Sequence, residues 1–354
     1  MIDQSRITEE WIDEVTGTHK ADPILTEKVI RALLLLEGLV KQDLPFVFKG
    51  GTALMLHFDS TKRLSIDIDI ILSDKQLDLD ETLNALVEEQ GFTRYELQKR
   101  EARSDIEKAH YKLFYEPVKE TGRPEGYVLL DILFEEVHYK DLMKLPVHSH
   151  FVPQEGEPIM VDIPSKEDLL GDKLTAFAPN TTGIPYYRGE NSMSMEIIKQ
   201  LYDIGNLFDE VEKLHLVKET FQKFAIAELA YRDKSELKPT DILEDIYQTS
   251  LSICTHGKDG EADFEELQNG IHRIQNYVFS EKYHIEKAIP HATKAAYLAT
   301  ILKHDTDTLE RFEPGIDMKD WIIESPFNTR VNKLKKSDPE AFFYWYKMYE
   351  LTRN

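Results

Sequence analysis

Lys49-Gly50-Gly51-Thr52 and Ser65-Ile66-Asp67-Ile68-Asp69 are the two most informative segments of this sequence. The apolar residues 46–48 predict a short strand that ends at the two glycines, and Thr52 begins a short apolar helix. Glycines between a strand and a helix let backbone N–H groups approach an anion closely, and the start of a helix carries partial positive charge. The first segment is therefore either a phosphate-binding turn or an ordinary turn.

The second segment lies in a strand predicted over 64–72, in which isoleucines alternate with polar residues. Asp67 and Asp69 share one face of that strand, with Cα atoms roughly 6.5–7 Å apart from the strand rise. Two carboxylates this close repel each other unless a cation lies between them, and Mg²⁺ favours carboxylate oxygens together with substrate phosphates. The alternative interpretation is the solvent-facing side of an edge strand.

A third carboxylate, Asp131, interrupts the otherwise apolar strand predicted over 127–134. A carboxylate in such a strand is costly unless it is paired with a cation or hydrogen-bonded. If this strand lies beside 64–72, three carboxylates converge on one site, which suits two-metal phosphoryl or nucleotidyl transfer. The alternative is that Asp131 anchors a neighbouring loop.

Charged residues break the apolar pattern of two predicted helices. Lys173 lies on the apolar stripe of helix 166–178, so its ammonium group either reaches outward to solvent or points into a site. In helix 194–210, Lys199 and Asp203 are four residues apart, and spacing alone favours an ordinary surface pair.

The order of predicted elements indicates an α+β protein. A short helical extension, 1–22, precedes a core of mixed sheet and helices over 23–165 and a helical domain over 166–354. The remaining predicted elements of the core are helices at 24–42 and 80–90, extended stretches at 92–101 and 108–117, and a turn at 121–126. The remaining predicted helices of the last domain cover 214–232, 240–256, 263–280, 285–303 and 339–351.

The last predicted helix carries an aromatic cluster that follows a basic segment, 330–336. Cations beside aromatic rings can grip RNA by phosphate contact and stacking. The helical spacing of Phe342, Trp345, Tyr346 and Tyr349 favours the other interpretation, that these rings are core.

Composition excludes several classes of protein. Lys and Arg number 43 against 65 Asp and Glu, a formal charge of −22 that argues against non-specific coating of DNA. The single cysteine, Cys254, excludes an intramolecular disulfide and a cysteine-based zinc site. Without a signal-peptide pattern at the N-terminus, and with 32–36 as the longest apolar run, we expect a cytoplasmic protein without a membrane span.

Four motifs together resemble the AbiEii/AbiGii-type nucleotidyltransferase family, which includes abortive-infection and toxin–antitoxin toxins. Its members share G-G-[ST], R-x-S-x-D-[IL]-D-[IL], D-K-x-x-[AS] and K-x-x-Y-D-[IL], in this order. Here these motifs read Gly50-Gly51-Thr52, RLSIDIDI at 63–70, DKLTA at 172–176 and KQLYDI at 199–204. The resemblance spans roughly residues 25–210 and implies a polymerase-β-like nucleotidyltransferase mixed sheet with flanking helices, followed by a helical C-terminal domain.

The resemblance also implies roles for individual residues. Asp67 and Asp69 would bind two Mg²⁺ ions, with Mn²⁺ as a substitute. Asp131 matches none of the four motifs, and we expect it to be a third carboxylate, metal ligand or base, by analogy with the wider nucleotidyltransferase superfamily. Lys173 would contact the triphosphate, and Asp203 would be an essential carboxylate, which replaces the surface-pair interpretation by analogy. The expected nucleotide-binding residues are Lys49, Gly50, Gly51, Thr52, Arg63, Ser65 and Lys173. Arg63 would either neutralise phosphate charge or pair with a carboxylate.

The activity implied is transfer of a nucleoside monophosphate from an NTP to an acceptor hydroxyl, with release of pyrophosphate. By family analogy a tRNA 3′ end is the first acceptor to expect, then a protein side chain or a small hydroxylated molecule. A cognate antitoxin is an expected partner. Two alternatives stay open: a non-catalytic binding protein that retains the fold, and a metal-dependent phosphohydrolase.

Overall fold

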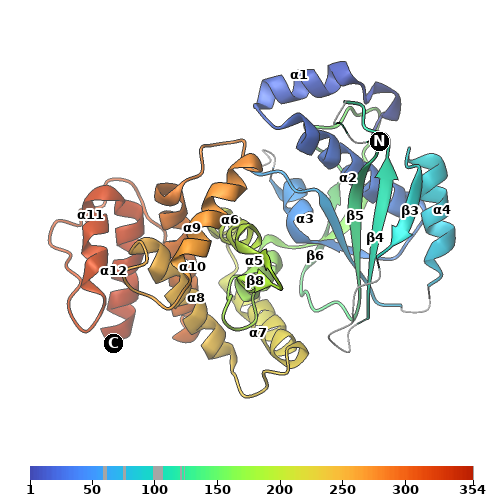
Figure 1. Ribbon diagram of the computed structural model, residues 1–354. Helices are drawn as coiled ribbons and strands as arrows, with labels where there is room; N and C mark the ends of the chain where they lie inside the picture. The colour runs from blue at the N-terminus through green and yellow to red at the C-terminus, as the bar shows by residue number, and fades with distance from the viewer. Residues whose placement is uncertain (59–61, 75–76, 99–106, 120–121, 123, 354) are drawn as a thin grey trace. The chain divides into compact units, whose positions relative to one another are not determined.

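The computed structural model describes residues 1–58, 62–74, 77–98, 107–119, 122 and 124–353 (Figure 1). The chain forms two compact units. Unit 1 consists of Met1–Ser165 and Asn276–Lys282, and unit 2 consists of Lys166–Gln275 and Tyr283–Asn354. The predicted 1–22 extension therefore belongs to unit 1, and the division after Ser165 falls where the sequence changes from mixed to helical patterning.

Unit 1 is built on a five-stranded mixed sheet with strand order β1-β2-β5-β4-β3. The central pair, β2 and β5, is parallel, whereas the other neighbours are antiparallel. The strands are β1 (Val47–Lys49), β2 (Asp67–Leu72), β3 (Arg94–Leu97), β4 (Glu107–Tyr115) and β5 (Gly126–Phe134). The strands predicted at 64–72 and 127–134 are therefore direct neighbours, and β2 begins at Asp67, three residues later than predicted.

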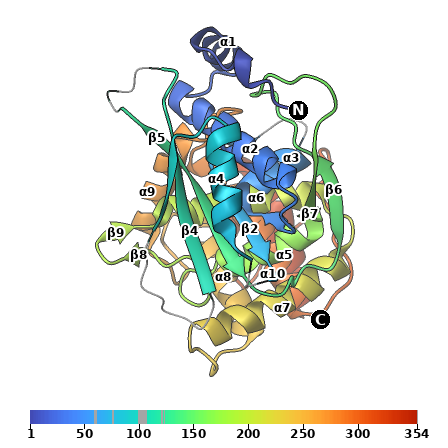
Figure 2. The same cartoon turned by 90° about the vertical axis from the view of Figure 1, so that its right-hand side faces the viewer.

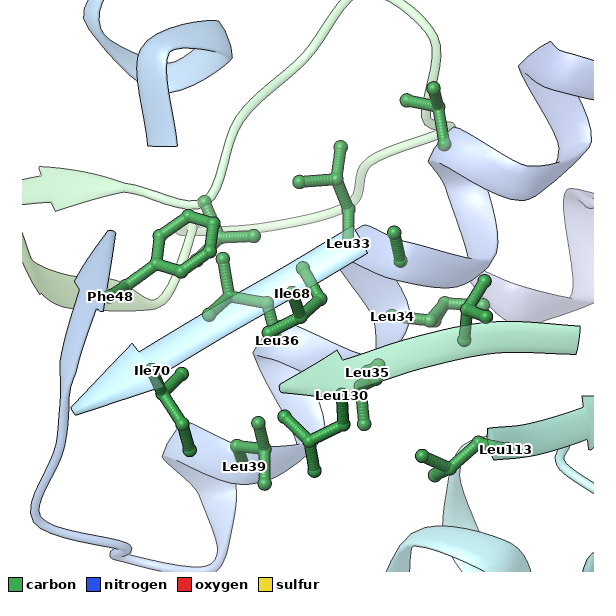
Figure 3. Close-up of a cluster of buried hydrophobic side chains, with 14 of the residues drawn as sticks. Leu33, Leu34, Leu35, Leu36, Leu39, Phe48, Ile68, Ile70, Leu113 and Leu130 are labelled. Atoms are coloured by element: carbon green, nitrogen blue, oxygen red, sulfur yellow. The ribbon is translucent and has the colours of Figure 1, made fainter. Parts of the chain in front are cut away.

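Helix α2 (Pro23–Lys41) supplies much of the apolar core of unit 1. It begins where the Asp22 side chain accepts a hydrogen bond from the Leu25 N–H and Pro23 occupies the first turn, a favourable start for a helix. Its leucines pack against alternate, inward-facing residues of β2 and β5 such as Ile68 and Leu130 (Figure 3). Burying each such side chain contributes about 1.5–3 kcal/mol. This packing commits one face of the sheet to the core.

The remaining elements of unit 1 surround that core. Helix α4 (Leu79–Glu89) packs on α2 and β3 (Figure 2), and α3 (Gly50–His57) follows β1 directly. The other elements are η1 (Gln4–Arg6), α1 (Glu9–His19) and a separate hairpin of β6 (Leu142–Pro146) with β7 (Met160–Pro164). Residues 276–282 join this unit because Phe279 packs against the Phe151 ring and the Tyr277 carbonyl accepts the Leu64 N–H.

Unit 2 is helical, apart from a short hairpin of β8 (Tyr187–Arg188) with β9 (Asn191–Ser192). Its principal helices are α5 (Lys166–Ala176), α6 (Ser194–Glu210), α7 (Leu214–Tyr231), α8 (Pro239–Cys254), α9 (Phe264–Arg273), α10 (Ile285–Lys303) and α12 (Pro339–Arg353). Its shorter elements are η2 (Ile274–Asn276), η3 (Thr329–Lys333) and α11 (Leu334–Ser337). Helix α10 packs on α6, α8 and α12 (Figure 1). The helices of the described residues all lack the length or the hydropathy that crossing a membrane requires.

The structure confirms the predicted α+β class, with a mixed sheet followed by helices. The C-terminal aromatic residues are core: Phe342 and Trp345 are fully buried, Tyr349 is nearly so, and the half-buried Tyr346 stacks on Trp321.

The boundary of one predicted helix differs from the structure. The helix predicted over 263–280 ends at Arg273, because residues 276–282 leave the helical unit and pack within unit 1. Parts of the predicted elements at 92–101 and 121–126 lie outside the described residues.

Candidate functional site in unit 1 and a buried ion pair in unit 2

The glycine turn between β1 and α3 lies directly against the side chain of Asp69. Gly50 has φ +82°, a left-handed conformation that favours glycine, and a Cβ atom there would come within 2.2 Å of Asp69 Oδ2. The residue before helix α3, Lys49, does not cap the helix with its side chain. A carboxylate therefore borders the turn at which the first backbone N–H groups of α3 lie.

The other side of the turn is lined by polar side chains. A Cβ atom at Gly51 would come within 2.8 Å of both Arg63 Nη2 and Ser65 Oγ. The Arg63 side chain is buried and donates a hydrogen bond to the Leu64 carbonyl oxygen. The guanidinium group is therefore held beside the turn, a suitable place for neutralising phosphate charge.

Thr52 has a different local environment from its neighbours. It is fully buried, and its hydroxyl donates a 2.6 Å hydrogen bond to the Asp67 carbonyl oxygen. This bond fixes α3 against the start of β2. The Thr52 side chain therefore positions the turn relative to Asp67, and any phosphate contact by this residue would come from its backbone.

A row of polar residues crosses the sheet on the face opposite the α2 core. Lys49 pairs with Asp69 across β1 and β2, and Asp69 pairs with Asp131 across β2 and β5. Neighbouring strands lie about 4.8 Å apart, so the two carboxylates start from backbone positions at that separation. Asp67 lies two residues before Asp69 and shares the same face. The expected convergence of three carboxylates required β2 and β5 to be neighbours, which they are, and the convergence of the side chains themselves stays a prediction.

His110 extends this row to β4, and sequence reasoning missed it. It pairs with Asp131 in the ladder, and its Nδ1 lies 2.6 Å from Asp131 Oδ1. Both side chains are partly buried, at 16% and 29% exposed. The signal was present in the alternation of 108–112, which places Lys108, His110 and Lys112 on one face of an extended stretch. What the sequence lacked was the partner strand.

The donor set fits a magnesium ion held by few protein ligands. Among the described residues, no three His, Cys, Asp or Glu side chains are placed so that together they could hold a metal ion. Mg²⁺, however, is usually bound by one or two carboxylates, with substrate phosphates and waters completing the octahedron. Asp67 and Asp69 can supply such a pair beside the glycine turn, and Asp131 is the adjacent third carboxylate.

In unit 2, Lys173 and Asp203 form a buried ion pair. Lys173 Nζ on α5 lies 2.7 Å from Asp203 Oδ2 on α6, and the side chains are only 7% and 4% exposed. The ammonium group also donates to Gln200 Oε1 at 3.2 Å. The interpretation of Asp203 as half of a surface pair is therefore wrong, because α5 packs on α6 and buries the carboxylate.

Helix α10 carries a partly buried histidine whose pKa is influenced by Asp203. The His291 ring packs against Gly205, where an added Cβ atom would come within 2.2 Å of the ring carbon Cγ. The ring also contacts the Tyr202 and Tyr283 rings. Burial lowers the pKa of His291 to about 3, helped by the positive charges of two lysines and opposed by Asp203. The ring is therefore neutral near pH 7.

The family that the chain resembles is recognised from sequence. Residues 34–284 match the sequence profile of the family described as "Nucleotidyl transferase AbiEii toxin, Type IV TA system". No curated protein matches the chain.

Three solved structures resemble the fold at low identity. A candidate nucleotidyltransferase from Helicobacter pylori has 16% identity and a TM-score of 0.41, covering 86% of this chain and 100% of that one. The protein JHP933 from Helicobacter pylori has 15% identity and a TM-score of 0.39, covering 84% of this chain and 94% of that one. An antigenic nucleotidyltransferase-like protein from Paracoccidioides brasiliensis has 13% identity and a TM-score of 0.34, covering 58% and 93% respectively.

Proposed function

The chain belongs to the AbiEii nucleotidyl transferase toxin family, and on that premise we propose that it transfers a nucleoside monophosphate from an NTP to an acceptor hydroxyl. One observation carries the proposal: the Asp69 carboxylate lies against the Gly50 backbone and is in register with Asp131 on the neighbouring strand. Acidic groups therefore border the turn that can hold phosphate oxygens.

In this proposal the glycine turn binds the triphosphate. The N–H groups at the start of α3 carry partial positive charge that favours anions, and the Arg63 guanidinium beside Gly51 would offset the negative charge of the phosphates. The acceptor oxygen attacks the α-phosphorus, the bond from that phosphorus to the bridging oxygen breaks, and pyrophosphate leaves. Asp131, whose carboxylate is held by His110, is the third carboxylate and serves as metal ligand or as acceptor of the hydroxyl proton.

Asp67 and Asp69 are the residues that we propose to hold Mg²⁺. When bound, the ion would offset the negative charge of the attacking and leaving oxygens. The two carboxylates share one strand face beside the turn, so the protein presents them from a rigid element. For Lys173 and Asp203 we propose the roles that the family resemblance implies, a contact to the triphosphate and a carboxylate essential for activity.

For the acceptor we propose a tRNA 3′ end first. The charge of −22 disfavours RNA binding unless cations cluster locally, so the choice of acceptor is the part of the proposal that most needs a direct test. The family description names a toxin of a type IV toxin–antitoxin system, and we propose an antitoxin as the partner on that basis.

The test is label transfer by the full-length protein. Each α-³²P-labelled NTP is incubated with Mg²⁺ and either total RNA or total protein, and the labelled acceptor is identified by gel electrophoresis. Asp67→Asn and Asp69→Asn should abolish transfer while the circular dichroism spectrum stays unchanged. Asp162→Asn is the matched control, because that carboxylate lies on a unit 1 strand in an exposed pair with Lys144.

The alternatives give different results in the same experiment. Release of phosphate without any labelled acceptor would indicate a phosphohydrolase. Absence of transfer together with absence of Mg²⁺-dependent nucleotide binding in calorimetry would indicate a non-catalytic binding protein. Full transfer by the Asp67→Asn/Asp69→Asn double variant would refute the proposed site.

A further inference from the structure

A cluster of aromatic rings and lysines lies beside the carboxylates of unit 1. Tyr127 on β5 pairs in the ladder with Phe114 on β4, and their ring centroids are 5.9 Å apart. Lys112 Nζ lies 4.5 Å from the centroid of the Tyr127 ring, and Lys28 Nζ lies 5.3 Å from it. We call these four residues the platform.

The charge of the platform is unbalanced. In the described part of the chain, no carboxylate forms an ion pair with Lys28 or Lys112. The nearby Arg94, in contrast, stacks on Phe114 but is neutralised by Glu125 at 2.8 Å. Glu96, the ladder partner of Lys112, is likewise engaged by Arg94. In a chain with a net charge of −22, the two ammonium groups that make no ion pair with a described residue form a local site for anions beside the Tyr127 ring.

The platform adjoins the carboxylate row. Lys112 pairs in the ladder with Leu129, which in turn pairs with Asp67. Tyr127 precedes Asp131 by four residues on the same face, a separation of about 13 Å at the rise of a strand. This distance corresponds to a few nucleotides of an extended strand. A polynucleotide bound here can therefore present its end to the carboxylates.

A cavity opens at the edge of the platform. Its volume is about 290 Å³, and it is lined by Ile24, Glu27, Lys28, Tyr115, Pro117, Glu125, Gly126 and Tyr127. This is close to the lower limit of small-molecule sites, about 300 Å³, and gives room for one planar base. Two tyrosines and aliphatic residues provide a surface on which a base can stack. The two lining carboxylates are neutralised by Arg31 and Arg94, whereas Lys28 makes no ion pair with a described residue and is available to a phosphate.

We propose that the platform binds the single-stranded 3′ segment of a polynucleotide acceptor. This inference rests on the proposed nucleotidyl transfer and assigns a place to its acceptor. A base stacks on Tyr127, and Lys28 and Lys112 contact the phosphates. Phe114, whose ring is covered by the Arg94 guanidinium, packs beside the Tyr127 ring and supports it. The lysine–ring contacts are weak at a partly exposed ring, so a stacking base can displace an ammonium group to a phosphate.

The test measures binding without catalysis. Fluorescence anisotropy is recorded with a 5′-fluorescein-labelled 12-nucleotide single-stranded RNA and the full-length protein, in the absence of NTP. Tyr127→Leu should weaken binding about 5- to 100-fold, whereas Tyr127→Phe, which keeps the ring, should not. Lys28→Gln and Lys112→Gln should each reduce the slope of log Kd against log salt by about 0.7. Lys223→Gln, an exposed lysine on α7, is the matched control and should change neither value.

Several outcomes would overturn the proposal. Equal affinity in the platform variants and the Lys223→Gln control would do so, and so would tighter binding of the fully paired duplex of the same RNA. An effect of Tyr127→Leu on the KM for NTP alone would assign the platform to the donor nucleotide instead. Because RNA binding is measured without NTP, absence of label transfer would reject the proposed function but leave this result intact. Label transfer to an acceptor other than a nucleic acid, together with absence of RNA binding, would reject the proposed role of the platform but not the proposed function.

Discussion

Replacing Gly50 with alanine is expected to disturb both the stability of unit 1 and the proposed phosphate turn. The left-handed φ of +82° costs an alanine about 1–2 kcal/mol. The added Cβ would also come within 2.2 Å of Asp69 Oδ2, so the carboxylate must move, and such overpacking costs about 1–3 kcal/mol. We therefore expect Gly50→Ala to lower the free energy of unfolding by about 2–5 kcal/mol.

Alanine substitutions at two other glycines of unit 1 separate the backbone cost from the overpacking cost. Gly156 has φ +66°, and a Cβ added there would have no atom within 4 Å, so Gly156→Ala reports the backbone cost alone, about 1–2 kcal/mol. Gly17 lies in helix α1, also with nothing within 4 Å, and Gly17→Ala should stabilise by about 0.5–1 kcal/mol.

The assay is urea-induced unfolding followed by far-UV circular dichroism and tryptophan fluorescence, with label transfer measured in parallel. In a double-mutant cycle, truncating Asp69 to alanine should recover the overpacking part of the cost of Gly50→Ala. The reasoning is refuted if Gly50→Ala costs no more than Gly156→Ala, or if its cost is the same with and without the Asp69 side chain.

Three further predictions concern buried charged or titratable groups. Lys173→Met or Asp203→Asn alone should destabilise the protein by about 3–5 kcal/mol in thermal unfolding, because each leaves a buried group without its partner. Lys173→Met combined with Asp203→Leu removes both groups and should be close to neutral. His110→Leu should lower label transfer about 10- to 100-fold, and His110→Asn, which keeps a donor for Asp131, should lower it less; equal losses would contradict a positioning role. Because the folded-state pKa of His291, about 3, lies below its unfolded value, its contribution to stability is complete above pH 6.5 and is lost as the pH falls towards 3, with a slope of up to about 1.4 kcal/mol per pH unit. Urea unfolding at pH 7, 6 and 5 should show this loss, and His291→Asn should flatten it.

Alternation along the strands was sufficient to predict which residues share a face. The isoleucines of 64–72 predicted the buried side of β2, and the structure places Ile68 and Ile70 in the core. The opposite side of the strand was therefore predicted to be polar, and it includes Asp67 and Asp69. These inferences succeed because the side-chain period of a strand is a local property of the backbone.

The register of the strands and the choice of neighbouring elements could not be predicted from alternation. Alternation leaves open a shift of two residues, so the pairing of Asp69 rather than Asp67 with Asp131 follows only from the parallel packing of β2 and β5. The environment of Asp203 shows the same limit, since spacing within one helix pointed only to Lys199, whereas the packing of α5 on α6 buries Asp203 and brings Lys173 to it.

The residues themselves thus specified the α+β order of elements, the glycine turn and the acidic side of β2, because each depends on contacts between near neighbours in the chain. Tertiary structure alone placed His110 on Asp131, and it alone gathered Lys28, Lys112 and Tyr127 from three separate elements. Such groupings depend on how the sheet packs against α2, and that packing is determined by the burial of the whole core rather than by any single segment.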